Sequence, residues 1–225
     1  MLVGVGKAWR RTACAAVLVG VVAGCSGAAE EDAEPSASPS VSASGKAGKA
    51  ESAGTVGGAG SACLLPVGFG LAAEWKADAV DGSTADGSGK AGVDADMASL
   101  LRQGPVSLVC EIDAKPAGHL GFLRVFTGEP GAEDGDARAV LEAFVAAQEG
   151  AEKAKYSTFE TGGLAGVEVE YLATSELLDQ AKQESAFAVV TPDGPVVVHL
   201  GGADTEEHRD MLPAFELAER TLHTV

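Results

Sequence analysis

Two carboxylates at alternate positions form the first arrangement in this sequence that could perform acid–base chemistry. Glu168 and Glu170 are two residues apart in the alternating run 166–174, so on a strand both would point to one face. Carboxyl groups held about 5–9 Å apart in a cleft can hydrolyse a glycosidic bond. The intervening Val167, Val169 and Tyr171 are also typical of a half-buried strand with a polar outer face, and we favour this structural interpretation.

Other acidic residues are grouped in ways that could supply oxygen ligands to calcium. Their spacing does not match an EF-hand loop, and in a chain with 33 Asp and Glu residues such groups arise by chance. We therefore expect solvated or helix-capping roles, and no metal site, for Asp94 and Asp96 and for Glu129, Glu133, Asp134 and Asp136.

The four histidines, His119, His199, His208 and His223, are scattered and include no His-x-x-x-His pair, so a zinc site would need ligands from distant segments. His199 lies in a strand-like run and could be buried, whereas His208 is expected to be exposed near a helix start. The sequence contains no Gly-x-Ser-x-Gly or Ser-x-x-Lys motif, and residues 82–90 lack the spacing of a phosphate-binding loop. We predict no catalytic residue and no cofactor.

Phe69 and Trp75 are the candidates for lining a ligand pocket, because large aromatic side chains commonly do so. Packing in the core is the more common role for such residues, and both interpretations remain open.

The N-terminus has the pattern of a secretory signal peptide over residues 1–24. Lys7, Arg10 and Arg11 supply positive charge, and the uncharged stretch 12–23 follows; it is short for a membrane span. The run Val22-Ala-Gly-Cys25 resembles the lipobox of bacterial lipoproteins. The resemblance implies that Cys25 carries a diacylglyceryl group and becomes the first residue of a mature protein anchored at the extracytoplasmic face of the cell membrane. An ordinary secreted protein is the alternative.

Residues 25–60 are predicted to be a disordered tether after the lipidated cysteine, since Gly, Ala, Ser and Pro dominate and no apolar periodicity occurs. A linear interaction motif or a stalk with O-linked sugar on its Ser and Thr residues is the alternative. The formal charge of the whole chain is −17, which argues against nucleic acid as a partner.

Cys63 and Cys110 are the two cysteines left for the extracytoplasmic domain, because Cys14 lies in the signal peptide. An even pair in an oxidising compartment predicts a disulfide. A redox pair and two free thiols are the alternatives, and no Cys-x-x-Cys spacing supports the first.

Residues 61–225 are predicted to form one α+β domain, an antiparallel sheet covered by two or three helices. Strands are expected at 69–75, 106–113, 119–127, 166–174, 185–191 and 196–200, with helices at 136–153 and 204–222 and a long loop over 81–98 that ends in a short helix near 97–101. Val106, Leu108, Cys110 and Ile112 should share a face. Pro192-Asp-Gly194 predicts a hairpin, and Pro213 is expected to break or kink the last helix.

This order of elements is similar to that of the PsbP/Mog1-like superfamily. The resemblance covers about residues 65–225 and depends on Leu65-Pro-Val-Gly-Phe69, the run 167–172, the hairpin and the closing helix. Since members are mostly accessory or binding proteins, it implies a protein without catalysis. No functional residue of the family can be assigned.

Three functions follow as hypotheses. The first is a non-enzymatic, lipid-anchored envelope protein that binds a protein partner or a cell-wall component. The second is a carrier of a small molecule or lipid, and the third is an envelope hydrolase that uses Glu168 or Glu170.

The anchoring hypothesis makes a direct prediction. Because lipidation requires the thiol of Cys25, Cys25→Ala should leave the precursor unprocessed and without lipid, which mass spectrometry of the membrane fraction would detect. A mature, membrane-bound variant protein would contradict the hypothesis.

Overall fold

The computed structural model describes residues 48–80, 99–175 and 180–225. The predicted signal peptide, Cys25, the first part of the tether and the predicted loop 81–98 lie outside these residues. The described chain begins inside the segment expected to be tether.

An eight-stranded sheet is the centre of the fold, and all of its strand pairs are antiparallel. A short strand, β4 (Arg102–Gln103), pairs with β5 beside the main series. The order across the sheet is β3 (Lys76–Ala79), β5 (Val106–Asp113), β6 (Gly121–Thr127), β10 (Gly194–Gly202), β9 (Gln180–Thr191), β8 (Leu164–Ser175) and β7 (Ala151–Thr161).

A smaller sheet has the order β1 (Ser52–Val56), β2 (Val67–Ala72) and β11 (His223–Thr224). The prediction that residues 52–56 belong to the tether is therefore wrong, and the folded domain begins before residue 61. Strand β1 was missed because its Gly- and Ser-rich sequence carries little apolar signal. Pairing with β2, and the burial of Val56, hold it in place.

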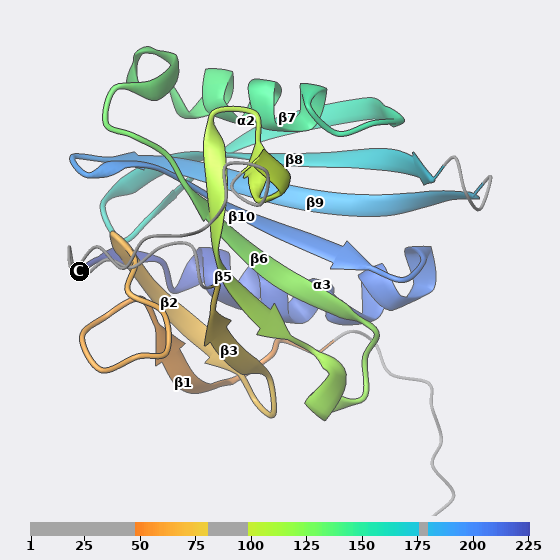
Figure 1. Ribbon diagram of the computed structural model, residues 1–225. Helices are drawn as coiled ribbons and strands as arrows, with labels where there is room; N and C mark the ends of the chain where they lie inside the picture. The colour runs from red at the N-terminus through yellow and green to blue at the C-terminus, as the bar shows by residue number, and fades with distance from the viewer. Residues whose placement is uncertain (1–47, 81–98, 176–179) are drawn as a thin grey trace, which may run out of the picture. The chain divides into compact units, whose positions relative to one another are not determined.

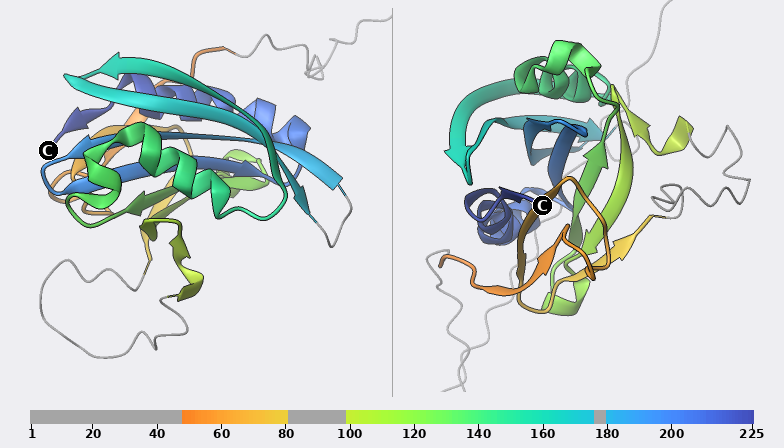
Figure 2. Two further views of the ribbon diagram at one scale, coloured as in Figure 1. Left: turned by 90° about the horizontal axis from the view of Figure 1, so that it is seen from above. Right: turned by 90° about the vertical axis from the view of Figure 1, so that its left-hand side faces the viewer.

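Helices lie on both faces of the large sheet (Figures 1 and 2). Helix α2 (Ala137–Ala146) packs on one face, here called the α2 face, and helix α3 (Thr205–Arg220) and the small sheet pack on the other, the α3 face. Short 3-10 helices, η1 (Lys115–Ala117) and η2 (Ala132–Gly135), lie in the connections. The predicted α+β class with an antiparallel sheet is confirmed.

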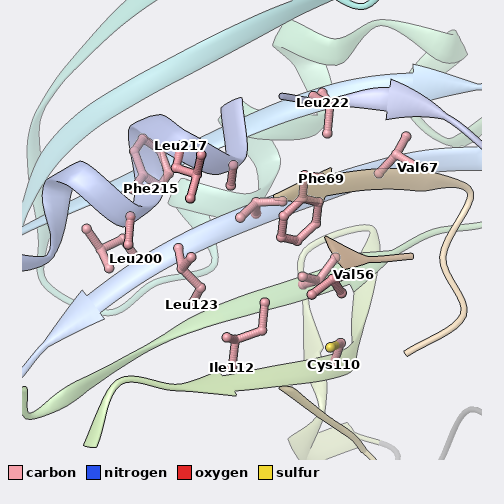
Figure 3. Packing of buried hydrophobic residues seen from close by; sticks show 14 of the residues in the cluster. Val56, Val67, Phe69, Cys110, Ile112, Leu123, Leu200, Phe215, Leu217 and Leu222 are labelled. Atoms are coloured by element: carbon pink, nitrogen blue, oxygen red, sulfur yellow. The ribbon is translucent and has the colours of Figure 1, made fainter. Parts of the chain in front are cut away.

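The larger hydrophobic core lies on the α3 face (Figure 3). Phe215 and Leu217 of α3 pack toward Leu123 and Leu200 of the large sheet, and Phe69 of β2 closes the core. Complete burial of such side chains contributes about 1.5–3 kcal/mol each. The stripe predicted for the last helix, Met211, Phe215, Ala218 and Leu222, is buried as expected.

The predicted hairpin joins β9 to β10. Thr191 pairs with Gly194, and the Thr191 hydroxyl accepts from the Asp193 N–H and donates to the Gly194 carbonyl. Gly194 has a φ of 119°, a conformation that favours glycine. Local residues thus determine the register of the two strands.

Strand β5 begins and ends as predicted, but its side chains do not share one face. The register shifts between Leu108 and Cys110, which indicates a bulge. Val106 and Leu108 consequently face α2, and Cys110 and Ile112 face α3. The alternation in the sequence could not reveal a bulge that only the pairing with β6 displays.

Helix α2 begins where predicted, with the Asp136 carboxylate accepting from the Arg138 N–H, but it ends at Ala146 instead of near residue 153. Gly150 has a φ of 68° and passes close to the Thr174 carbonyl, where a side chain would collide. The chain then enters β7, which we did not predict. As an edge strand, β7 is mostly exposed and lacks an apolar pattern.

Helix α3 begins at the predicted cap, where the Asp204 carboxylate accepts from the N–H groups of Glu206 and Glu207. The helix continues through Pro213 to Arg220, so the predicted break does not occur. Apolar contacts on both sides of the proline, at Met211 and Phe215, offset the missing hydrogen bond. Among the described residues, no helix is long and apolar enough to cross a bilayer.

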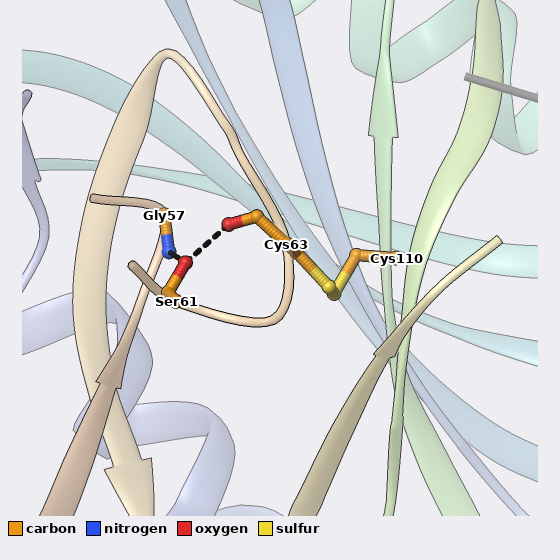
Figure 4. The surroundings of a disulfide bond; sticks show 4 residues. All are labelled: Gly57, Ser61, Cys63 and Cys110. Atoms are coloured by element: carbon orange, nitrogen blue, oxygen red, sulfur yellow. Dashed lines mark hydrogen bonds between the residues drawn. A yellow bond between two sulfur atoms is a disulfide. The ribbon is translucent and has the colours of Figure 1, made fainter. Parts of the chain in front are cut away.

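The predicted disulfide joins Cys63, between β1 and β2, to Cys110 of β5 (Figure 4). Both residues are fully buried, and the turn at Cys63 is closed by the Ser61 hydroxyl, which donates to the Cys63 carbonyl and accepts from the Gly57 N–H. The bond connects the small sheet to the large one.

Removal of this bond with Cys63→Ala/Cys110→Ala should lower the free energy of unfolding by up to about 4 kcal/mol, since the bond joins residues 47 positions apart in the sequence. Urea unfolding followed by circular dichroism measures the loss. A reductant should destabilise the wild type similarly and leave the double variant unchanged; equal stability of wild type and variant would contradict the prediction.

Candidate functional site

The two aromatic residues considered for lining a ligand pocket lie in the core. Phe69 is completely buried and Trp75 is 8% exposed, both within the cluster on the α3 face. This location favours packing over a ligand pocket.

The carboxylate pair lies on the α3 face. Glu168 and Glu170 share that face as predicted, because Val167, Val169 and Tyr171 point to the α2 face. Burial, followed by repulsion from Glu219, Glu170 and Glu216, raises the pKa of Glu168 to about 7. The charged groups that act on Glu168 are therefore all acidic, and no cation contributes to the shift of its pKa.

Asp94 and Asp96 lie outside the described residues, and Asp136 caps α2. Among the residues that the structure describes, no three potential ligands come together as a metal site would require.

The histidines have four different environments. His223 is exposed, and His119 lies 3.5 Å from a Glu207 carboxylate oxygen. His208 is fully buried, so the prediction of an exposed His208 is wrong: it lies on the same helical stripe as Met211, and its Nε2 is 3.2 Å from the Ser185 hydroxyl. Burial lowers the pKa of His208 to about 4.

His199 belongs to a buried polar group that we call the Glu184 cluster, made of Tyr171, Lys182, Glu184 and His199. The Tyr171 hydroxyl donates to Glu184 Oε2 at 2.9 Å, and His199 Nε2 lies 3.0 Å from the same oxygen. Because a carboxylate can only accept, Nε2 must carry the hydrogen. Lys182 Nζ lies 3.0 Å from Glu184 Oε1. One carboxylate thus links β8, β9 and β10.

These donors keep Glu184 ionised. Burial alone would raise the pKa of Glu184, but the hydrogen bond and charge of His199, with those of Lys182, lower it to about 2. Burial and the adjacent carboxylate raise the pKa of Tyr171, which keeps its proton. A buried carboxylate is tolerated only with such partners, and loss of one partner from a buried pair typically costs about 3–5 kcal/mol.

An open cavity of about 520 Å³ adjoins this cluster. Its floor crosses β10 at Gly201, where the lack of a side chain leaves room: a Cβ there would lie 3.2 Å from His199 Cε1. We call this space the Arg124–Lys182 cavity, and its lining residues are Asp113, Lys115, His119, Leu120, Gly121, Phe122, Arg124, Lys182, Glu184, Gly201, Gly202 and Ala203.

Arg124 also lines a second, smaller cavity of about 270 Å³, together with His199. Arg124 Nε donates to Glu111 Oε2 at 2.9 Å, and its guanidinium carbon lies 4.9 Å from the centre of the Phe122 ring. No residue of α2 lines either cavity, so polar side chains such as Arg124 and His199 border open space here beside apolar ones such as Leu108 and Phe126.

This arrangement contains one pair of groups that hydrolase sites also use. A carboxylate that orients a histidine is part of many hydrolase sites, and among the described residues His199 Nδ1 has no hydrogen-bond partner. However, the described residues that line the two cavities include no serine, threonine or cysteine that the histidine could activate.

Lys182 and Glu184 were missed because they belong to no motif. A signal was nevertheless present: the register of the predicted hairpin places Glu184 opposite Gly201 and Ala186 opposite His199. Glu184 and His199 are therefore diagonal neighbours on one face. Tyr171 joins the Glu184 cluster through the pairing of β8 with β9, which the hairpin does not determine.

The opposite pKa shifts of His208 and Glu168 predict opposite effects of pH. As pH falls from 6.5 to 4, the unfolded chain protonates its histidine first, so His208 lowers stability. As pH falls from 7 to 4.5, the folded protein protonates Glu168 first, so Glu168 raises stability. Between pH 6.5 and 4.5, Glu168→Gln should lose stability more steeply than wild type, and His208→Gln less steeply or not at all. Urea unfolding at both pH values tests this, and parallel profiles for the two variants would contradict it.

Comparison with known proteins adds two distant structural likenesses. The solution structure of cyanobacterial PsbP (CyanoP) from Synechocystis sp. PCC 6803 is 15% identical, with a TM-score of 0.46 over 77% of this chain and 99% of that chain. The crystal structure of LpqN, involved in cell envelope biogenesis of Mycobacterium tuberculosis, is 15% identical, with a TM-score of 0.36 over 71% of this chain and 83% of that chain. No curated protein has a significantly similar sequence.

The family comparison covers most of the chain. Residues 32–222 match the model of a family described as uncharacterised lipoprotein, and the chain therefore belongs to this Lipoprotein_23 family.

Proposed function

We propose that this protein is a lipid-anchored envelope protein that binds another envelope component, a protein or part of the cell wall, at the extracytoplasmic face of the membrane and without catalysis. Membership of a lipoprotein family supports the anchor, and Cys25 is the residue that would carry the lipid. The tether would give the domain reach.

The observation that carries the binding role is the Glu184 cluster beside the Arg124–Lys182 cavity. A sheet face that needed only stability would be covered by apolar side chains, as it is beneath α2. Here the sheet instead carries an ionised, fully hydrogen-bonded carboxylate next to an open space of ligand size. Groups held in this way provide a rigid polar surface for recognition.

A small-molecule binding module is the second candidate, and the volume of the same cavity favours it. Lipid carriage has less support, because Phe69 and Trp75 are packed inside the core between sheet and helix.

Two equally exposed leucines allow a matched test. Leu120 lines the cavity and is 59% exposed, whereas Leu64 lies between β1 and β2 and is 61% exposed. A photoreactive residue at position 120 should cross-link to an envelope component in intact cells, and one at position 64 should not.

Digestion of the adduct with a muramidase or a protease identifies the component as wall or protein. Equal labelling from both positions, or none from position 120, would overturn the proposed binding surface.

A further inference from the structure

We propose that the Arg124–Lys182 cavity recognises an oxyanion, a carboxylate or phosphate group of its ligand; this inference deepens the proposed function and depends on it. The argument rests on hydrogen-bond donors that the protein leaves unused at the cavity wall.

Arg124 supplies the first donors. Only its Nε is engaged, in the ion pair with Glu111, and among the described residues its two terminal amino groups have no partner. The Phe122 ring beneath the guanidinium restrains its orientation. The edge formed by the two amino groups matches the two oxygens of a carboxylate or phosphate.

Lys182 supplies another donor from the opposite wall. Its ammonium group has three N–H bonds, and the described acceptors are two, Glu184 Oε1 at 3.0 Å and the Gly202 carbonyl at 2.9 Å. The side chain is 31% exposed, so the third N–H can reach a ligand. Gly201 lies between the two cationic side chains and keeps the floor open.

The charge distribution points the same way. The whole chain has 16 Lys and Arg residues against 33 Asp and Glu. In the lining of the two cavities cations slightly outnumber acids instead: there are four cations (Arg102, Lys115, Arg124 and Lys182) and three acids (Glu111, Asp113 and Glu184).

Each of the three acids accepts from a donor of the protein: Glu111 Oε2 from Arg124, Asp113 Oδ1 from the backbone N–H of Lys115, and both oxygens of Glu184 from its cluster. These contacts reduce the pull of the acids on a cation. The unpaired donors of Arg124 and Lys182 favour an anion instead.

The test is isothermal titration calorimetry of the full-length protein, extracted in detergent from the producing cells. The probes are soluble muropeptides for peptide carboxylates, glycerol 3-phosphate for phosphate, and N-acetylglucosamine as an uncharged control. We expect at least one anionic probe to bind and Arg124→Gln to weaken its binding at least tenfold.

Arg138→Gln is the matched control. Arg138 likewise uses Nε to pair with a carboxylate, that of Glu142, and lies over an aromatic ring, that of Tyr156, but it does not line either cavity. This variant should bind like wild type, and thermal unfolding verifies that both variants fold.

Binding of muropeptides alone would identify a wall carboxylate as the source, and binding of glycerol 3-phosphate alone a phosphate. Absence of binding by both anions, or equal binding by wild type and Arg124→Gln, would overturn the inference. If position 120 still cross-links under that result, the proposed binding function stands and only the oxyanion inference fails.

Discussion

A strand in the middle of the large sheet has hydrogen-bonded neighbours at both edges, so its side chains can be covered only from above and below. Every inner strand therefore needs a partner layer on two faces. Helix α3 and the small sheet cover one face, and α2, with only ten residues, covers part of the other. The remainder of that face is left to solvent, a ligand or the polar groups of the sheet itself, and Glu111, Arg124, Lys182 and Glu184 lie there.

The Glu184 cluster shows how the sheet meets this requirement. The residues that surround the carboxylate come from three adjacent strands, and each gives it a donor. The desolvation of Glu184 is thereby offset, and the strands are tied together beyond the limit of α2. Lys182 donates to Glu184 and the Gly202 carbonyl, and Arg124 donates to Glu111, so each keeps a further donor at the cavity. The Glu184 cluster thus stabilises the strands beside the cavity and contributes to the polar chemistry of the cavity wall.

The α3 face contains two ionisable groups whose burial acts in opposite directions. Burial of His208, on the inner side of α3, lowers its pKa and keeps it neutral. Burial and the neighbouring carboxylates of Glu219, Glu170 and Glu216 raise the pKa of Glu168. Between these two pKa values both groups are mainly uncharged in the folded protein. The two shifts depend on tertiary neighbours, since His208 and Ser185 are 23 residues apart in the chain.

The sequence by itself determined the features that depend on neighbouring residues. Asp136 and Asp204 cap the helices because a short acceptor precedes each helical stripe, and Pro192-Asp-Gly194 fixes a hairpin because its residues adopt the turn directly. The pairing of Cys63 with Cys110 followed from their number and compartment. Only the tertiary structure decided the features that depend on distant partners. Strand β1 exists through its pairing with β2, the bulge in β5 is set by β6, and α3 passes through Pro213 because the sheet holds it on both sides. The Glu184 cluster belongs to this second group: its donors are brought together by strand register, which no short motif encodes.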